Sequence, residues 1–420
     1  MKGCMIVLAF GGAAMMSLVN AQSQLSLLFP FGIPIQQNSA SSFFIGGAAT
    51  AVADDYTVML RNPANLGFID KTVFSSLYAF QFTRVGESGQ HNNFKTGYPR
   101  QVSLGIPAGK FGTIGISYDN QSDAATKFRP ASQQFGFDTS AVTYQGGLAT
   151  TGGIIGWQIG WGREMPSLLH MRVGAAYERI YFSYTETILR SVTDISRTID
   201  SRDSTYKNLG ANAFRGGILL PIGKIKVGLS GEYFFPAQVQ WNNAVYSASS
   251  DTNYAYGVMA VPIDRIDRSA KVRIPPSIAL GISYSMTPEW LAAADFSSVL
   301  WNLYNGHGLF SSARSDMAPS FSAGVQYVPT VALLNPKYWE TVRYGAGFRY
   351  AQLPAPKSSE FAFSLGTGLP IGRGRGEFDI GAEFGRRTSG NYSGYKEDFV
   401  QIAIGISGGH KWSKSSEGNY

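Results

Sequence analysis

From residue 72 onward, apolar and polar side chains alternate with a period of two, which is typical of strands that bury one face. Ile278, Leu280 and Ile282, for example, are separated by small residues. The alternating segments run longer than the five or six residues usual in soluble β-proteins. The pattern predicts fourteen strands, near residues 72–84, 100–108, 111–120, 154–163, 170–186, 209–221, 224–235, 276–286, 290–301, 318–328, 339–351, 359–370, 375–387 and 398–411.

The lengths of the links between these strands alternate as well. Short links at 109–110, 164–169, 222–223, 287–289 and 371–374, and a longer one at 329–338, alternate with long polar links that include 121–153, 187–208 and 236–275. Short turns on the periplasmic side and long loops outside are typical of outer-membrane barrels. We therefore predict an all-β fold: a 14-stranded antiparallel transmembrane β-barrel over residues 71–412, with a polar tail at 413–420.

Composition supports a membrane barrel over a soluble protein. Only 15% of the residues are charged, compared with roughly 25% in soluble domains. Beyond the first residues, no stretch approaches the roughly 20 apolar residues that a membrane-spanning helix needs. Several aromatic residues fall near predicted strand ends, where rings favour the lipid–water boundary: Tyr98, Tyr118, Trp157, Trp161, Tyr233, Trp290, Trp301, Tyr327, Trp339 and Tyr350.

The first 21 residues have the features of a secretory signal peptide. Lys2 gives the positive start, an apolar stretch extends to Val19, and Val19-Asn20-Ala21 fits a cleavage site. The only cysteine, Cys4, lies in this leader, so the exported chain would have no thiol. We expect a multi-pass barrel in the cell outer membrane, in contact with outer-membrane lipid.

The net charge does not indicate nucleic-acid binding. The formal charge is +7, and it falls to +6 if Lys2 leaves with the leader. The positive residues are scattered through expected loops and strand ends, without a basic run. We therefore expect no nucleic-acid partner.

Residues 22–70 differ from the rest of the chain. An apolar stretch punctuated by proline is followed by small residues from Gly46 to Ala53. A helical turn could start at Asp54 or Asp55 and must stop before Pro63. Since the segment is too short to form a domain, we expect it to lie inside the barrel as a hatch that plugs the pore.

The stretch from Gly46-Gly47-Ala48 through Asp54-Asp55 to Asn62-Pro63-Ala64 resembles the N-terminal hatch of the FadL/TodX family of outer-membrane transporters of long-chain fatty acids and hydrocarbons. Asn65 departs from the family, which often has glycine there. The resemblance implies a fourteen-stranded barrel plugged by its N-terminal segment. It further implies that a hydrophobic ligand enters from outside, binds in the barrel and leaves laterally at a kinked strand. Related barrels also act as accessory proteins in surface secretion.

The lateral exit needs a strand whose backbone leaves the ladder, and glycine tolerates this best. Gly112 and Gly115, on the predicted third strand, are the candidates for this gate. The alternative is that they only relieve crowding in the lumen. For the ligand site the candidates are Phe29, Phe43, Phe44 and Ile45, which could instead simply pack the hatch against the wall.

Two arginines, Arg343 and Arg349, share the polar face of one predicted strand and should point into the lumen. A guanidinium could hold a ligand carboxylate by its planar fork. The alternative is pairing with acidic residues on the next strands: Glu360, Glu377, Asp379 and Glu383.

Enzyme chemistry finds little support. A serine hydrolase needs a histidine base, and none of His91, His170, His307 and His410 falls in a recognised catalytic motif. No metal-ligand pair occurs at helical spacing, and the glycine-rich stretch 372–376 reads as a hairpin turn. We expect no catalytic residues, cofactor or metal. The sequence predicts a monomeric passive transporter for hydrophobic small molecules, with a secretion-accessory barrel, a general porin and an outer-membrane hydrolase as alternatives.

Overall fold

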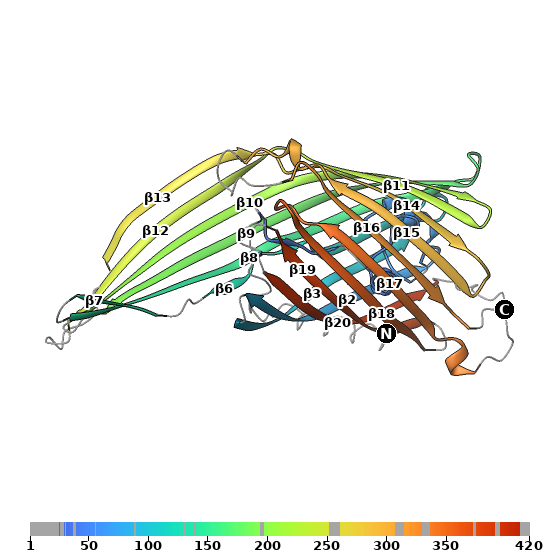
Figure 1. The fold of residues 1–420 in the computed structure, drawn as a ribbon. Coiled ribbons are helices and arrows are strands. Elements are labelled where there is room, and N and C mark those ends of the chain that lie inside the picture. The colour runs from blue at the N-terminus through green and yellow to red at the C-terminus, as the bar shows by residue number, and fades with distance from the viewer. Residues whose placement is uncertain are drawn as a thin grey trace, which may run out of the picture.

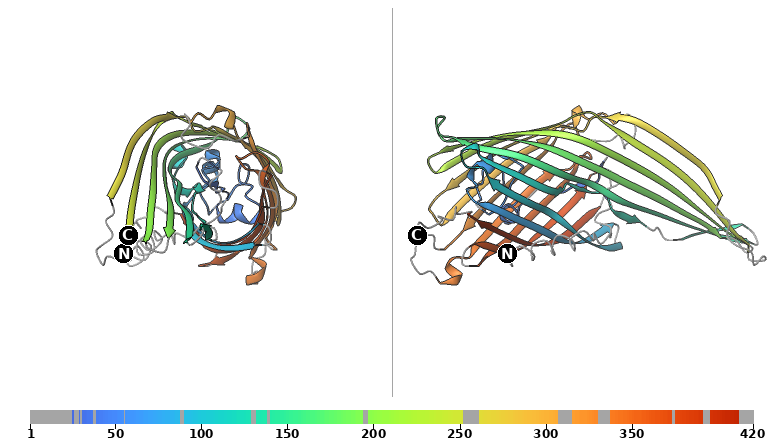
Figure 2. Two further views of the ribbon diagram at one scale, coloured as in Figure 1. Left: turned by 60° about the vertical axis from the view of Figure 1, so that its left-hand side comes forward. Right: turned by 180° about the vertical axis from the view of Figure 1, so that it is seen from behind.

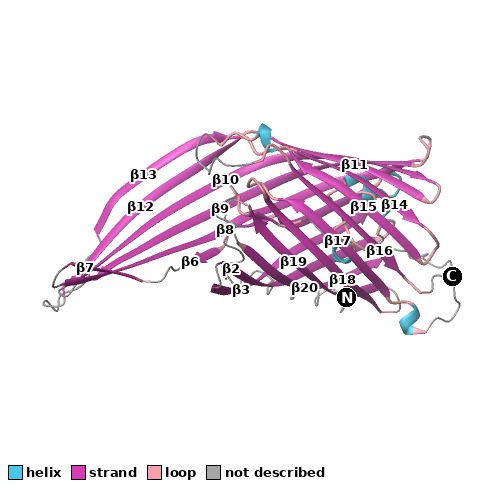
Figure 3. Ribbon diagram, viewed as in Figure 1, coloured by secondary structure: helices cyan, strands magenta, loops and turns pink. Residues whose placement is uncertain are grey.

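In a computed structural model the chain is almost entirely β-stranded (Figure 3). The expected signal peptide and the tail at 413–420 lie outside the described residues. Within the described part, no helix has the length and apolarity needed to cross a membrane. The structure describes residues 25, 29, 31–36, 39–54, 56–87, 90–128, 132–137, 140–193, 197–251, 261–306, 315–329, 337–372, 375–390 and 395–411.

Antiparallel strands form a closed barrel with fourteen positions around its circumference, as the alternation predicted (Figure 1). The ring closes where the first strand pairs with the last, with Thr72 opposite His410. The strands are β2 (Thr72–Glu87), β3 (Gln90–Pro107), β4 (Thr113–Asn120), β8 (Ser140–Met165), β9 (Met171–Thr193), β10 (Arg197–Ile222), β11 (Ile225–Phe234), β14 (Ser277–Ser285), β15 (Trp290–Val299), β16 (Ala318–Tyr327), β17 (Arg343–Gln352), β18 (Ser358–Ile371), β19 (Gly376–Ser389) and β20 (Lys396–His410).

Three positions of the ring are continued by further strands. β6 (Thr126–Phe128) and β7 (Gln133–Phe137) follow β4 along the same edge of β8. β12 (Ala237–Asp251) follows β11 along β10. β13 (Val261–Val272) precedes β14 and pairs with β12. These further strands therefore lengthen existing positions of the barrel and add no new ones.

Beyond the barrel, β8, β9, β10, β12 and β13 continue as one curved sheet, which projects to the left in Figure 1. We call this part the extension. It corrects the prediction that 121–153, 187–208 and 236–275 are loops, because all three ranges contain strands. Polar and apolar side chains mix on both faces, as at Leu189 and Val192, so the period-two signal is missing, although the backbone ladder is continuous from Thr198 to Leu219 of β10.

The outer surface of the barrel is apolar. On β14, Leu280 points outward and is 51% exposed, whereas the inward-facing Ser283 is 2% exposed. Because an apolar outer face and a polar interior are the reverse of a soluble fold, the barrel spans a membrane. Trp157, Trp161 and Trp290 lie exposed on the outside as expected, but Tyr98 and Trp301 are buried inside, which corrects their predicted place at the boundary.

The remaining elements are short. The N-terminal segment contains β1 (Ile33–Pro34), α2 (Ala40–Phe44) and the 3-10 helix η2 (Pro63–Phe68), and it lies inside the barrel, drawn blue in the left view of Figure 2. β1 pairs outside the main ladder with β5 (Ser122–Asp123). Links contain the 3-10 helices η3 (Gly109–Phe111), η4 (Trp301–Leu303) and η5 (Tyr338–Glu340).

Candidate functional site

The helix α2 fixes the N-terminal segment in a groove of glycines. Ser39 caps the helix by accepting a hydrogen bond from the Ser42 amide. The Phe44 side chain lies against three wall glycines on adjacent strands: a Cβ atom would come within 2.6 Å of Phe44 at Gly345, 2.0 Å at Gly366 and 2.6 Å at Gly381. The wall therefore needs glycine at these positions in order to admit this side chain.

The four predicted ligand residues do not form one pocket. Phe43 and Phe44 share a cluster with Leu77, whereas Ile45 belongs to a second cluster and Phe29 to a third. All four are at most 5% exposed and pack against neighbouring side chains. This is the packing role that the sequence left open for them, and contact with ligand stays a prediction.

After α2, the chain is tied to β15 by a single carboxylate. Asp295 Oδ2 accepts hydrogen bonds from the amides of Ala49 and Thr50, both at 2.8 Å, and from the Thr50 hydroxyl at 2.7 Å. Two strands away on the same side of the wall, a Cβ atom at Gly228 would lie 2.2 Å from the Thr50 carbonyl oxygen. The loop thus packs directly against the wall formed by β11, β14 and β15.

The Asn62-Pro63-Ala64 motif forms the start of η2. Asn62 accepts a hydrogen bond from the Ala64 amide and donates to the carbonyl oxygen of Thr50 at 2.7 Å. Its side-chain amide also donates to the Ile218 carbonyl of the wall at 3.3 Å. Asn65, the departure from the family pattern, donates to the Ala49 carbonyl at 2.9 Å. The motif therefore holds two turns of the N-terminal segment together.

The acidic pair before this motif does not start a helix. Asp54 accepts from the Tyr56 amide at 2.8 Å, and the described residues up to Asn62 are not helical. The helical turn expected between Asp54 and Pro63 is therefore wrong, because the carboxylate closes a local turn instead of capping a helix. Asp55 lies outside the described residues.

Both predicted lumen arginines point inward, but each is surrounded by carboxylates. Arg343 lies 2.9 Å from Asp379, 2.5 Å from Glu377 and 3.3 Å from Asp54. The Asp54 contact attaches the N-terminal segment to β17. Since three carboxylates already surround this guanidinium, ligand contact by Arg343 stays a prediction.

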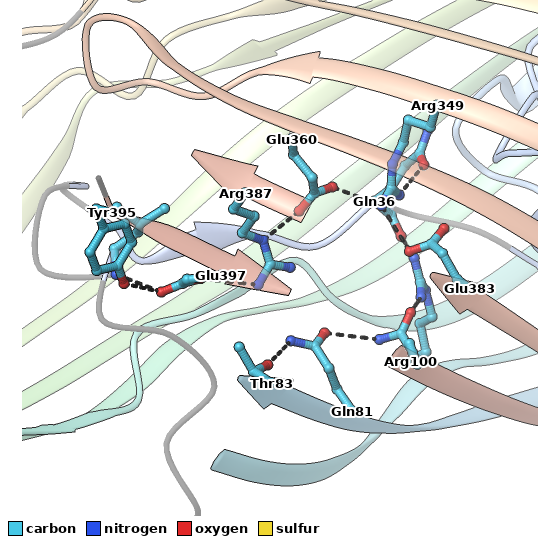
Figure 4. A network of polar contacts seen from close by, with 12 residues as sticks. Gln36, Gln81, Thr83, Arg100, Arg349, Glu360, Glu383, Arg387, Tyr395 and Glu397 are labelled. Atoms are coloured by element: carbon cyan, nitrogen blue, oxygen red, sulfur yellow. Dashed lines mark hydrogen bonds and ion pairs between the residues drawn. The ribbon is translucent and has the colours of Figure 1, made fainter. Parts of the chain in front are cut away.

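Arg349 belongs to a second chain of polar contacts (Figure 4). Its guanidinium lies 2.7 Å from Glu360 and 2.9 Å from Glu383, and it donates to Gln36 of the N-terminal segment at 2.7 Å. Glu360 continues the chain to Arg387 at 2.5 Å. The sequence named these acidic residues as the alternative partners of both arginines, and the structure brings them together.

The two predicted gate glycines lie where the wall is intact. Gly112 has a φ of 96° in the turn before β4. Gly115 faces Leu66 of the N-terminal segment, because a Cβ atom there would lie 2.8 Å from Leu66 Cδ2. The ladder from β3 through β4 to β8 is continuous across Gly115. A gate at Gly112 and Gly115 stays a prediction.

Six residues after Gly115, regular pairing with β8 gives way to two hydrogen bonds, from the amides of Gln121 and Ala124 to the carbonyls of Ile154 and Gly152. Beyond Asn120 the chain turns inward as β5, where Ile33 pairs with Asp123 and Pro34 with Ser122. Ser122 donates from its hydroxyl to the Phe31 carbonyl and accepts from the Ile154 amide at 2.9 Å. The wall is therefore kinked at residues 121–125, and the N-terminal segment occupies the kink.

Two glycines of β8 make the kink possible. Gly152 and Gly153 have φ of 117° and 147°, which side chains rarely adopt. A Cβ atom at Gly153 would lie 2.1 Å from the Ser122 carbonyl oxygen. Sequence reasoning missed this site because 121–153 was read as a loop, although the adjacent Gly-Gly pair was a usable signal.

An apolar cluster borders the kink inside the barrel. The Phe31 ring packs edge-on against Phe182 at 5.3 Å and Tyr304 at 5.9 Å between ring centroids, and lies 6.5 Å from Trp301. We call this group the Phe31 cluster. Its other members include Ile154, Ile180, Leu209, Phe234, Val239 and Val272.

Aromatic side chains continue from this cluster into the extension. Tyr184 stacks on Phe182 at 6.3 Å, and the Lys207 ammonium lies 5.2 Å from the Tyr184 ring and 5.6 Å from the Trp241 ring. Burial lowers the pKa of Lys207 from its ordinary value. An amphipathic strip thus leads from the extension to Phe31.

Together these features define a membrane-spanning β-barrel of fourteen strands whose N-terminal segment lies in the lumen and occupies a kink in the wall. The chain belongs to the BamG family, whose family model matches residues 3–419. No curated protein matches it in sequence comparison.

Solved structures share this fold. The toluene transporter TbuX of Ralstonia pickettii is 14% identical with a TM-score of 0.56, covering 89% of this chain and 99% of its own. The toluene transporter TodX of Pseudomonas putida is 15% identical with a TM-score of 0.58, covering 90% and 99%. A FadL homologue of Pseudomonas aeruginosa is 13% identical with a TM-score of 0.57, covering 91% and 100%. The resemblance to FadL/TodX barrels is thereby confirmed for the fold.

Proposed function

We propose that this protein is a passive outer-membrane channel for small hydrophobic molecules, in which the N-terminal segment acts as a hatch. The observation that carries the proposal is the kink at residues 121–125, which β1 occupies by strand pairing. An inward turn in an otherwise closed wall is a place where cargo can leave toward lipid without crossing the polar interior. The similar barrels TbuX and TodX are toluene transporters, which supports the cargo class.

The cargo path follows the aromatic side chains of the extension and of the Phe31 cluster. Hydrophobic molecules collect on the aromatic strip at Tyr184 and Trp241 and reach the Phe31 cluster. Because the Phe31 carbonyl accepts from Ser122, displacement of Phe31 pulls on the strand that fills the kink. The lateral exit lies at 121–125, beyond the Gly112 and Gly115 positions that sequence suggested.

A disulfide that locks β1 to β5 tests this mechanism. Ile33 and Asp123 are directly paired antiparallel partners, so cysteines at both positions meet on one face. Apart from Cys4, the sequence contains no cysteine. In cells carrying Ile33→Cys with Asp123→Cys, we expect toluene uptake to fall at least tenfold under oxidation and to recover on reduction.

The matched control places a disulfide within the intact wall. Ser359 and Thr388 are paired partners on β18 and β19 whose hydroxyls lie 3.2 Å apart. The variant Ser359→Cys with Thr388→Cys should transport equally in both redox states. Undiminished uptake by the oxidised Ile33–Asp123 variant, with the crosslink verified by mass spectrometry, would rule out exit through the kink.

A second candidate is an accessory barrel that supports another protein at the cell surface. The extension favours it, because β8 and β10 each have 26 residues and continue well beyond the barrel. Deletion of the gene would then leave the uptake of toluene and of fatty acids unchanged, while a large partner would co-purify with the barrel.

We further propose that the protein is not an enzyme. The neighbours are named as transporters and channels. Within the described ranges, no group of three or more metal-ligating side chains is found. Purified protein should leave ester and peptide substrates intact, and activity lost on replacing His170 or His410 would contradict this.

A further inference from the structure

A cavity of about 210 Å³ lies inside the barrel. The N-terminal segment contributes Ile35 and Arg61, and the wall contributes β10, β11, β14 and β15. The space exceeds the roughly 150 Å³ of an engineered cavity that holds benzene. It can therefore accept a small organic molecule. Its polar wall residues include Arg215, Ser230, Glu232, Ser277 and Ser297.

The Arg61 guanidinium lies at this cavity, and no carboxylate that the structure describes is close to it. It donates to the Gly47 carbonyl and to the Ser297 hydroxyl, both at 3.1 Å. In the described part of the chain, no carboxylate oxygen lies within 4.0 Å of its guanidinium. Asp295 attracts it from farther away, through a carboxylate whose Oδ2 accepts from Ala49 and Thr50 and whose Oδ1 has no hydrogen-bond partner among the described residues.

Three other lumen arginines differ from Arg61. Arg215, which lines the same cavity, lies 2.6 Å from Glu232, and Arg343 and Arg349 each have two or more carboxylates within 4.0 Å. Guanidinium carries five N–H donors, of which Arg61 uses two in the contacts above. Arg61 is half-buried, and a cation withdrawn from water without a close anion is costly, so an anionic ligand at Arg61 would be stabilised.

Ser230 supplies a second open group. It is 6% exposed and points inward from β11, as Glu232 does two residues later. Its hydroxyl makes no hydrogen bond to any residue that the structure describes. In contrast, both Glu232 oxygens are used, one by Arg215 and one by Ser277 at 3.1 Å. The Arg61 guanidinium and the Ser230 hydroxyl therefore have hydrogen-bond donors left to offer in this cavity. An anion with several acceptor oxygens suits both groups.

We propose that this cavity binds the carboxylate of a small organic acid. The guanidinium of Arg61 holds the carboxylate and the Ser230 hydroxyl donates to it, while Ile35, Ala279 and Val299 contact the apolar part. A planar carboxylate matches the fork of a guanidinium. The site does not depend on transport, since binding can occur whether or not the hatch moves.

Calorimetry on the purified full chain in a non-ionic detergent tests the site, with benzoate as the probe. Benzoate should bind, and benzamide, which has the same shape without the charge, should bind at least tenfold more weakly. Acetate should also bind more weakly, because it leaves the apolar contacts empty. Equal affinity for benzoate and benzamide, equal affinity for benzoate and acetate, or no binding of benzoate would overturn the proposal.

Variants locate the binding. Arg61→Gln should weaken benzoate at least tenfold and Ser230→Ala about threefold, whereas Arg386→Gln, at an exposed arginine on β19, should leave affinity unchanged. Heat-modifiable migration in SDS gels shows that each variant is a folded barrel. Unchanged affinity in folded Arg61→Gln would place benzoate elsewhere. Because this assay uses purified protein, loss of uptake in cells and loss of benzoate binding are separate results.

Discussion

The wall of the barrel and the extension are made of the same strands in two different surroundings. In the wall part of β9, the outward residues Tyr177 and Tyr181 are aromatic and exposed on the lipid side. On the same face of the extension part of β9, Thr185 and Thr187 are polar and Leu189 is apolar. The ladder of hydrogen bonds is equally regular in both parts. The contrast teaches that backbone hydrogen bonds between neighbouring strands are enough to form the strand. Whether lipid or water surrounds the strand then determines which side chains it carries.

The largest expected effect lies in the interior of the wall. Asp379 is 0% exposed and lies 2.9 Å from Arg343. Asp379→Ala leaves part of the charge of Arg343 uncompensated, and we expect a loss of about 3–5 kcal/mol in the free energy of unfolding. Urea unfolding in phospholipid vesicles measures it.

The control for this variant is an exposed ion pair near the end of the barrel. Asp398→Ala removes the partner of Arg386, and both side chains are more than half exposed. We expect a loss below about 1 kcal/mol. Equal losses in Asp379→Ala and Asp398→Ala would mean that the interior network is solvated and is not a closed core.

The next largest effect is expected from a charge placed on the outer surface, where its cost in stability should differ between the wall and the extension. Leu280→Arg places a cation in the middle of the lipid-facing surface of β14, with an expected cost of about 2–4 kcal/mol. Tyr206→Arg makes a comparable change on an exposed residue of the extension, where water covers the outer face and the cost should stay within about 0.5 kcal/mol. Similar costs in the two variants would place the extension in lipid as well.

The smallest effect is expected where β8 passes from the wall to the extension. Gly153→Ala forces a side chain into a φ of 147° and against the Ser122 carbonyl, with an expected loss of about 1–3 kcal/mol. Gly216→Ala, where a Cβ atom meets nothing within 4 Å, should be neutral or stabilise by up to about 1 kcal/mol. A neutral Gly153→Ala, measured by the same urea unfolding, would show that the kink relaxes easily.

The sequence predicted the wall well and the interior only in part. Period-two alternation, as at Ile278 to Ile282, follows directly from lipid on one side and polar neighbours on the other, so all fourteen strands could be read. The extension has no such contrast between its faces, and its strands were read as loops. Pairing of Arg343 and Arg349 with acidic residues was foreseen because both share one strand face.

The features that contact the N-terminal segment were harder to read. The kink at 121–125 and the cavity at Arg61 depend on contacts between segments far apart in the sequence, such as Ile33 with Asp123. No local pattern encodes such contacts. The local sequence signals of these contacts were few: Gly152-Gly153, Phe31 and the glycines that receive Phe44.

The pairing of β2 with β20 also has a consequence for assembly. The seam of the cylinder joins residues from the two ends of the barrel, so it can close only after the last strand has been delivered to the membrane. By then Phe44 must already be seated against Gly345, Gly366 and Gly381, because a sealed cylinder leaves little room for the ring to be threaded in afterwards. Biogenesis of this protein is therefore expected to wrap the sheet around its own leading segment.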